Sequence, residues 1–304
     1  MTDDNVQLVV VGSIGIDTIE TPFDRREEIL GGSVSYACAA ASFYTTVGMV
    51  GVVGEDFPDE FLEVYRGFGI DLAGLQRAAG RTFRWSGVYE ADMVNRRTLL
   101  TELNVFEAFS PELPDAYRDA PFFLLGNISP ELQLHVLEQA RAPRFVVADT
   151  MDLWINIARD ALEGVIGKVD MLTLNDGEAR LLTDEYNLRQ CAESILDMGP
   201  TYVVIKKGEH GAMLVSRNGI ALLPAYPVGE TLDPTGAGDA FAGGFMGALA
   251  RDGEIDDAHV RQALLHGATV ASFGVQDFSL DRLRTLSPDL VSARLRELKA
   301  MIGQ

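Results

Sequence analysis

Residues 232–245 read LDPTGAGDAFAGGF, a glycine-rich turn that leads into a helix predicted over Ala240–Ala250. Glycines allow successive backbone N–H groups to converge on one point. The N-terminus of the following helix adds unpaired N–H donors and about half a positive charge. Residues 236–238 therefore predict an anion-binding site that suits a transferring phosphoryl group or an oxyanion.

Asp239 stands at the edge of this predicted site, where its charge would repel a bound anion. A lone aspartate in a first helical turn often serves only as a cap or a dipole partner. Here the repulsion favours a catalytic interpretation, in which Asp239 takes a proton from an attacking hydroxyl group. Gly243, Gly244 and Gly247 each cost about 1 kcal/mol relative to alanine inside a helix. They predict that this helix packs closely against a neighbour or a ligand-bearing segment.

The overall charge of the chain limits its partners. The 304 residues allow one large domain or two smaller ones, and 45 acidic against 25 basic residues give a formal charge of −20. That excess argues against binding to nucleic acid or to an acidic membrane, because both require clustered lysine and arginine. A phosphate ligand remains compatible with it, because backbone N–H groups hold anions without net positive charge.

The N-terminal sequence MTDDNVQLVVVG is acidic and enters a predicted strand directly, so it lacks the basic start of a secretory signal. The uncharged run of small and apolar residues at 240–250 is too short to cross a bilayer. Cys38 and Cys191 are far apart and predict two free buried thiols. The four histidines show no metal-ligand spacing, which argues against zinc. We therefore expect a cytoplasmic protein.

Apolar runs alternate with helical patterns along the chain. The predicted strands are Leu8–Val11, Val47–Val53, Phe122–Leu125, Phe145–Ala148, Met171–Leu174 and Tyr202–Ile205. The predicted helices are Val34–Phe43, Glu131–Ala140, Trp154–Gly164, Glu178–Leu182, Ala192–Met198, Ala240–Ala250, Asp256–Phe273 and Leu290–Met301. Near-continuous apolar strands are typical of a parallel sheet covered on both faces. The pattern therefore predicts a layered α/β fold.

Two segments depart from this alternation. Residues 14–22 and 81–103 mix polar and strand-forming side chains, and the longer segment predicts a hairpin around Ala91–Arg97. Together they predict a small second sheet that acts as a lid or as a homodimer interface. A hairpin without function is the alternative. Because no repeat or linker interrupts the chain, we expect residues 1–304 to form a single domain that carries this sheet.

Several motifs resemble those of the ribokinase/PfkB carbohydrate kinases. DPTGAGDAFAGGF resembles the C-terminal motif of that family, and GGSVSYA at 31–37 resembles its N-terminal diglycine motif. VGVVGEDF at 50–57, NDGE at 175–178 and KKGEHGA at 206–212 lie in the family's order. The resemblance covers nearly the whole chain. It implies a ribokinase-like three-layer αβα fold with a mostly parallel central sheet, a small β lid, and ATP as phosphate donor.

The resemblance also implies roles for particular residues. The positions that match the catalytic centre are Asp239, as base, and Gly236, Ala237 and Gly238, as anion hole. The positions that match the acceptor site are Asp17, Gly31 and Gly32. Each of these residues taken alone could be an ordinary turn or cap. Their occurrence together, in the family's order, favours the catalytic interpretation.

Other positions match the nucleotide and cation sites of the family, which implies ATP with Mg²⁺ and, as in some relatives, K⁺. The nucleotide positions are Asn175, Glu178, Lys207, Gly208, Gly211 and Gly267. Asn175 and Glu178 match the pair that organises magnesium and its waters, in keeping with the tendency of Mg²⁺ to retain water. Asp233 and Thr235 match positions whose oxygen atoms help to hold K⁺.

The chain departs from the family pattern in the acceptor region. Ser33 and Tyr36 stand where kinases of free ribose commonly carry Lys and Asn, which argues against ribose itself. The missing Lys also argues against an already phosphorylated sugar. Residues 149–153 lack the Asn and Arg of the family's D-x-N-x-R motif, which weakens assignment as a keto-deoxygluconate kinase.

We therefore expect an ATP-dependent phosphotransferase that acts on a hydroxyl group of a sugar or sugar-like molecule. Asn127 lies close to a substrate-contacting position of the family. A nucleoside acceptor is the first alternative, because Phe83 and Trp85 on the predicted lid could stack on a base as well as on a sugar or pack the lid itself. A catalytically silent sugar- or nucleotide-binding protein is the second. The chain contains neither G-x-x-x-x-G-K-[ST] nor a G-x-G-x-x-G after its first strand, so P-loop and dinucleotide-binding functions are disfavoured.

Overall fold

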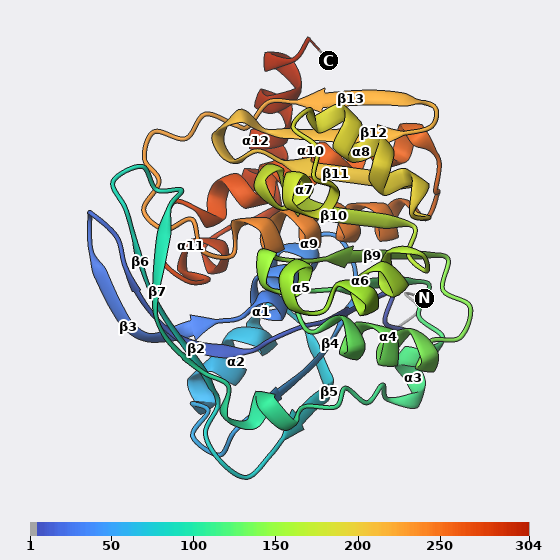
Figure 1. Cartoon of the computed structure of the whole chain (residues 1–304). Coiled ribbons are helices and arrows are strands. Elements are labelled where there is room, and N and C mark those ends of the chain that lie inside the picture. Colours follow the sequence, from blue (N-terminus) through green and yellow to red (C-terminus); the bar gives the residue numbers. More distant parts are fainter. Residues whose placement is uncertain (1–4, 304) are drawn as a thin grey trace.

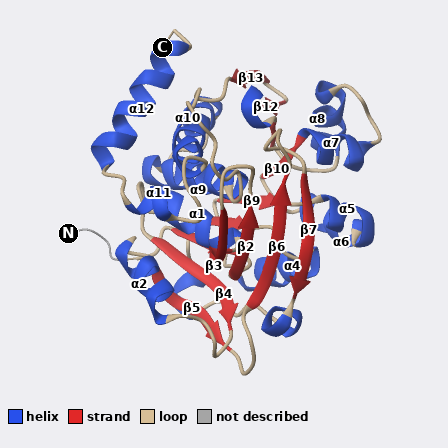
Figure 2. Ribbon diagram, turned by 90° about the vertical axis from the view of Figure 1, so that its left-hand side faces the viewer, coloured by secondary structure: helices blue, strands red, loops and turns tan. Residues whose placement is uncertain are grey.

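A mostly parallel sheet forms the centre of the molecule (Figures 1 and 2). The computed structural model describes residues 5–303, so the acidic start at 1–4 lies outside the described residues. The sheet has nine strands in the order β13-β12-β11-β10-β9-β8-β1-β4-β5. The pairs between β11 and β5 are parallel, whereas β12 and β13 add an antiparallel edge. The strands are β1 (Leu8–Val11), β4 (Val47–Val53), β5 (Asp71–Arg77), β8 (Phe122–Leu125), β9 (Phe145–Asp149), β10 (Met171–Asn175), β11 (Tyr202–Lys206), β12 (Ala212–Ser216) and β13 (Gly219–Leu223).

Helices cover both faces of this sheet, because successive residues of each central strand point to opposite sides. In β1, Leu8 and Val10 pack into one apolar cluster, and Val9 and Val11 pack into the other. The helices that contribute to the first cluster are α1 (Ser33–Ala41), α2 (Asp59–Gly67), α9 (Ala237–Asp252), α10 (Asp257–Gly274), α11 (Asp281–Arg284) and α12 (Pro288–Met301). Those that contribute to the second are η1 (Asn104–Ala108), α3 (Asp115–Arg118), α4 (Pro130–Gln139), α5 (Asp152–Ile157), α6 (Arg159–Ile166), α7 (Asp176–Thr183) and α8 (Leu188–Asp197). The predicted three-layer αβα fold is confirmed.

A second, four-stranded sheet with the order β3-β2-β6-β7 lies to one side of the central sheet, on the left in Figure 1. Its strands are β2 (Gly15–Glu20), β3 (Arg25–Gly31), β6 (Phe83–Tyr89) and β7 (Arg96–Glu102). β6 and β7 form the hairpin predicted around Ala91–Arg97, and β2 pairs with β6 in parallel. Residues far apart in the sequence are thereby joined in one small sheet.

Sequence patterns missed four strands and joined two helices into one. β3 reads RREEILG, and its first four side chains are exposed, so it lacks the apolar signature of a strand. β5 and β13 are the edge strands of the central sheet and are only partly buried, and β12 pairs with β13 next to that edge. The single helix predicted over Trp154–Gly164 is wrong. The chain breaks at Ala158, which has φ −134° and ψ 36°, and neither Gly nor Pro announces this break.

The glycines of α9 account for its close packing against α1 and α10. A Cβ at Gly243 would lie 2.1 Å from the carbonyl oxygen of Ala37, and one at Gly247 would lie 2.7 Å from that of Ala41. On the other side, a Cβ at Gly244 would lie 3.2 Å from a backbone carbon of α10. The predicted close approach is confirmed. It fixes the start of α9, and with it Asp239, against the rest of the core.

Two further expectations concern the chain as a whole. Within residues 5–303, none of the helices combines the length and apolar character needed to cross a membrane. Cys38 and Cys191 are buried and unpaired, as predicted.

Candidate active site

The residues predicted for catalysis gather beyond the carboxyl ends of the parallel strands. β9 ends at Asp149, β10 at Asn175 and β11 at Lys206, and the parallel register places Lys206 beside Asn175. α9 begins at the same place, because Gly238 lies against the side chain of Lys206. Open α/β sheets bind ligands at this edge. The topology therefore singles out the start of α9, near the centre of Figure 1, as the candidate site.

The start of α9 has the geometry of an anion site. Gly236 precedes the helix with φ 74°, a left-handed conformation that favours glycine. The ring of Tyr36 would lie 2.3 Å from a Cβ at this position, so a side chain is excluded on steric grounds as well. Ala237, Gly238 and Asp239 form the first turn, whose N–H groups an α-helix leaves without intrahelical partners. The N–H of Ala237 donates to the carbonyl oxygen of Pro234 at 3.2 Å, so those of Gly238 and Asp239 are the donors left for a ligand. The backbone donors and the helix dipole therefore suit a bound phosphate.

Asp239 follows these donors, and its surroundings adjust its acidity. Loss of water raises the pKa of Asp239 to about 7, with a further contribution from the negative charge of Asp149. The positive charges of Lys206 and Arg96 act in the opposite direction. A pKa near neutral pH is the value at which a carboxylate works best as a general base.

Lys206 was not singled out by sequence, yet its side chain lies in the middle of this cluster. Its Nζ is 3.0 Å from one carboxylate oxygen of Asp149 and 3.2 Å from the other. The two side chains are 18% and 7% exposed, so the pair is largely shielded from water. Burial lowers the pKa of Lys206, but the charges of Asp149, Glu178 and Asp239 outweigh it and the net pKa is raised. A lysine that ends an apolar strand was the signal that could have found it.

Asp17, predicted to bind the acceptor, is 4% exposed on β2 and faces Gly31 of β3. A Cβ at Gly31 would lie 1.9 Å from Asp17 Oδ2, and one at Gly32, which has φ 94°, would lie 2.3 Å from the carbonyl oxygen of Ser13. Burial raises the pKa of Asp17 to about 8, with a contribution from Asp233. Asp17 Oδ1 is buried and has no hydrogen-bond partner within residues 5–303. A ligand hydroxyl group would satisfy such an oxygen.

Asp233 and Thr235 connect the loop before α9 to the second sheet. Asp233 is fully buried, and its Oδ1 accepts a hydrogen bond of 2.9 Å from the N–H of Thr235. Its Oδ2 has no partner in the described part of the chain, and burial raises the pKa of Asp233 to about 6. The Thr235 hydroxyl donates to that of Tyr89, on β6, at 3.0 Å. The free carboxylate oxygen is chemically compatible with a monovalent cation.

Asn175 and Glu178 cap the start of α7. The Asn175 side chain accepts from the N–H of Glu178 at 2.8 Å, and Oε2 of Glu178 accepts from the N–H of Asn175 at 2.6 Å. Burial raises the pKa of Glu178 to about 7, while Lys206 opposes this effect. Within residues 5–303, no group of three or more His, Cys, Asp and Glu side chains could hold a metal alone. Glu178 still fits Mg²⁺, because that ion is commonly held by one or two carboxylates together with substrate phosphates.

The other predicted nucleotide residues form close backbone contacts. Lys207 donates its N–H to the carbonyl of Gly211 at 2.8 Å, around the short turn η2 (Gly208–His210). A Cβ at Gly211 would lie 1.9 Å from a carbonyl oxygen of β13. Gly267, in α10, would place a Cβ 2.6 Å from the carbonyl oxygen of Phe241. These contacts account for both glycines structurally, and their roles toward a nucleotide stay predictions.

Asn127, Phe83 and Trp85 differ in their relation to the site. The side-chain oxygen of Asn127 accepts a 2.9 Å hydrogen bond from the indole of Trp154. Phe83 packs against an aromatic ring of η1, with the ring centroids 5.6 Å apart. Trp85 pairs in register with Asp17 across β2 and β6. The Trp85 ring lies over Gly87, within 2.2 Å of a Cβ placed there, whereas the Phe83 ring and Asp17 Oδ1 both lie close to Gly15.

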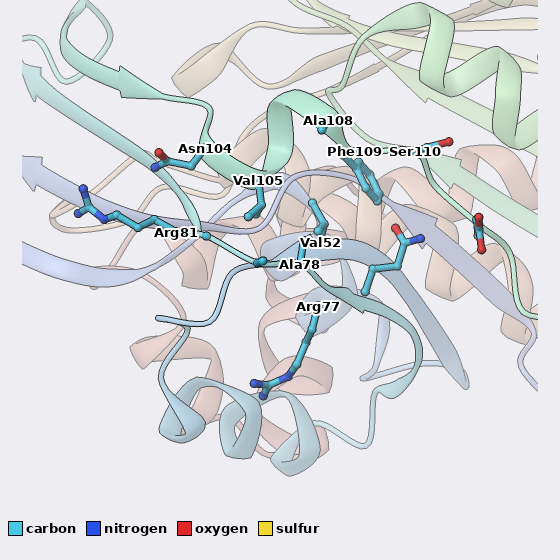
Figure 3. A pocket seen from close by; sticks show the side chains of 13 residues that line it. Val52, Arg77, Ala78, Arg81, Asn104, Val105, Ala108, Phe109 and Ser110 are labelled. Carbon is cyan, nitrogen blue, oxygen red and sulfur yellow. The ribbon is translucent and has the colours of Figure 1, made fainter.

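A separate surface pocket of about 550 Å³ lies between the end of β5 and η1 (Figure 3). Arg77, Arg81, Asn104 and Phe109 are among the residues that line it. The residues predicted for catalysis, nucleotide and acceptor do not line this pocket. It is therefore distinct from the candidate active site.

Comparison with known proteins identifies the chain at the level of its family. Residues 7–283 match the pfkB family carbohydrate kinases. The chain belongs to this family. The resemblance seen in the motifs is confirmed, and the protein is a phosphotransferase of the class that uses hydroxyl acceptors.

Relatives of this PfkB kinase act on more than one kind of acceptor. It is 32% identical over 259 residues to a cytidine kinase of Thermococcus kodakarensis, which covers 83% of this chain and 91% of that protein. It is 27% identical over 257 residues to a deoxyribokinase of Salmonella typhi, covering 81% of this chain and 82% of that protein. A solved structure of an E. coli protein assigned as ribokinase II, in complex with ATP and Mg²⁺, shares the fold with a TM-score of 0.79 at 19% identity. That match covers 96% of this chain and 99% of the other.

Proposed function

We propose that this kinase transfers the γ-phosphate of ATP to a hydroxyl group of a sugar or sugar-like small molecule, with Asp239 as general base. One observation carries the proposal: a carboxylate with a pKa of about 7 adjoins the N–H donors of Gly238 and Asp239 in the first turn of α9, which lack intrahelical partners. The solved relative that holds ATP and Mg²⁺ supports the choice of donor.

In the proposed reaction, the acceptor oxygen attacks the γ-phosphorus of ATP while its proton passes to Asp239. The bond between that phosphorus and the bridging oxygen breaks, and ADP leaves. Backbone donors at Gly238 and Asp239 stabilise the charge on the transferring group. Positioning and electrostatics supply most of the rate enhancement in such reactions, since the protein forms no covalent bond.

The acceptor is proposed to bind Asp17 through hydroxyl groups, close to the backbone of Gly31 and Gly32. The unpartnered oxygen of Asp17 supports this role. Glu178 and Asn175 would hold Mg²⁺ through its waters, and the ion would neutralise charge on the phosphates. The buried free oxygen of Asp233 supports a K⁺ site that includes Thr235.

A nucleoside acceptor is the second candidate. A Cβ at Gly15 would lie 2.9 Å from the Phe83 ring and 3.0 Å from Asp17 Oδ1, so an aromatic ring adjoins the predicted sugar-binding carboxylate. Stacking on a base would use that ring. The cytidine kinase relative supports the same choice.

Release of ADP, measured by a coupled assay over pentoses, hexoses, inositols and nucleosides, tests the proposed function. Each acceptor is assayed with and without K⁺. We expect ADP release with at least one acceptor and the loss of nearly all of it in Asp239→Asn. Release with nucleosides alone would select the second candidate, and no release with any acceptor would contradict the proposal.

The second sheet is proposed to act as a lid over the acceptor and as the contact between two copies of the chain. β7 exposes Leu99 and Leu100, at 59% and 46%, which supports an apolar contact. Residues 1–304 would then form one cytoplasmic catalytic unit. Sedimentation velocity tests the dimer, with Leu99→Ser expected to shift the protein toward the monomer and an unchanged monomer in the wild type contradicting it.

A further inference from the structure

Lys206 places a positive charge where four elements meet. It ends β11, its ammonium group contacts Asp149 at the end of β9, and its neighbour in register is Asn175 at the end of β10. The fourth element is α9, because a Cβ at Gly238 would lie 3.0 Å from Lys206 Nζ. An anion bound to the first N–H groups of α9 would therefore also contact this ammonium group.

The charges around Lys206 show why its burial needs a reason. Asp149, Glu178 and Asp239 all influence its pKa, so one ammonium group lies among three carboxylates. A buried ion pair often stabilises a fold no better than apolar side chains of the same size, because both charges lose their water. A bound phosphate would add further negative charge to a cluster that is already acidic. The positive charge of Lys206 therefore matters chiefly when a phosphate binds beside it.

Asp149 orients the ammonium group and leaves part of it free. Both of its oxygens lie within 3.2 Å of Lys206 Nζ, and Asp149 Oδ1 also accepts from the N–H of Thr150 at 2.9 Å. The backbone of Asp149 is held in turn by Gln133, whose Nε2 donates to its carbonyl oxygen at 2.9 Å. An ammonium group has three N–H donors. The contacts with Asp149 fix its position and leave capacity for a phosphate oxygen.

We propose that Lys206 is a catalytic residue that binds the transferring phosphoryl group of ATP, and that Asp149 is a positioning residue that holds its ammonium group in place. This inference rests on the proposed function. Lys206 takes no part in the proton transfer to Asp239. It donates a hydrogen bond to a non-bridging oxygen of the γ-phosphate, and that bond strengthens as charge develops in the transition state.

Two variants, Lys206→Met and Lys206→Arg, and the control Lys168→Met test the proposal through two readouts. Lys168 is exposed, and its neighbour Val169 belongs to the apolar cluster on the opposite side of the sheet from α9. Calorimetry measures binding of the ATP analogue AMPPNP and of AMP. We expect Lys206→Met to weaken AMPPNP binding about tenfold and to leave AMP binding unchanged. It should also lower kcat about 10²- to 10³-fold, the range for loss of one oxyanion donor. Lys206→Arg should restore part of both, and the control should match the wild type.

The double variant Lys206→Met/Asp149→Asn separates catalysis from a structural ion pair. It removes both charges, so a purely structural pair predicts recovery of thermal stability, AMPPNP binding and kcat together. The proposal predicts recovered stability with AMPPNP binding and kcat still impaired. Unchanged AMPPNP binding in a folded Lys206→Met protein would overturn it. If the wild type phosphorylates no acceptor, the proposed function fails, whereas the AMPPNP comparison still tests Lys206.

Discussion

Replacing Asp17 by asparagine should stabilise the free protein while weakening acceptor binding. The pKa of Asp17 is about 8 in the folded chain, against an ordinary value of 3.8. Each tenfold change in an acid constant corresponds to about 1.4 kcal/mol. At pH 7 the folded chain therefore holds a proton on Asp17 that the unfolded chain has released, which lowers the free energy of unfolding by about 4 kcal/mol.

The effect has a defined pH window. Below about pH 4 both states hold the proton, so its contribution to stability is fully present. Between about pH 4 and 8 only the folded state holds it, and stability falls as the pH rises toward the folded pKa. Asp17→Asn has no such proton, so its advantage over the wild type should widen with pH. We expect less than the full 4 kcal/mol, because an unpartnered amide costs about 1–3 kcal/mol of its own.

Guanidinium unfolding of wild type and Asp17→Asn at pH 5, 6, 7 and 8 measures this gap. The matched control is Asp160→Asn, a substitution at an exposed position on α6 that should change stability little. The Michaelis constant for the acceptor should rise several-fold in Asp17→Asn at pH 7, as for loss of one hydrogen bond between neutral groups, worth about 1 kcal/mol. A gap that stays constant from pH 5 to 8, or a variant less stable than the wild type at pH 8, would refute the reasoning.

Three further predictions concern the base, the core and the second sheet. Asp239 must be deprotonated to accept a proton, and its pKa is about 7. The value of kcat/KM should therefore fall about tenfold per pH unit below pH 7, and a flat profile from pH 5.5 to 8 would contradict this. Gly243→Ala forces a Cβ to within 2.1 Å of a carbonyl oxygen, so it should lower the free energy of unfolding, measured by urea titration, by about 1–3 kcal/mol. The control Gly229→Ala should not lower it, because a Cβ there has nothing within 4 Å. Tyr89→Phe removes the contact with Thr235 and should raise the acceptor KM several-fold in steady-state assays, with an unchanged KM arguing against a role for that contact.

The local chemistry of the site was readable from sequence. Gly236 and Gly238 precede an aspartate at a helix start, and their conformational freedom and unpaired N–H groups follow from residue type alone. The buried strands β1, β4 and β8 have the predicted bounds, because apolar runs mark strands covered on both faces.

The features that sequence missed depend on contacts between distant residues. Lys206 and Asp149 are 57 positions apart and meet only because β9, β10 and β11 are adjacent and in register. Thr235 and Tyr89 are 146 positions apart and meet because the end of β6 lies beside the loop that precedes α9. β3 carries charged side chains at a sheet edge, so its pairing with β2 determines its conformation more than its composition does.

The role of Asp239 as general base is tested most directly by the single-turnover rate of Asp239→Asn with saturating ATP and the best acceptor. Binding of AMPPNP, measured by calorimetry on the same protein, shows whether the variant is folded and holds nucleotide. The structure predicts nearly unchanged AMPPNP binding and a rate lower by about 10²- to 10⁴-fold, the range for loss of a general base. A rate equal to that of the wild type would contradict the assignment of Asp239.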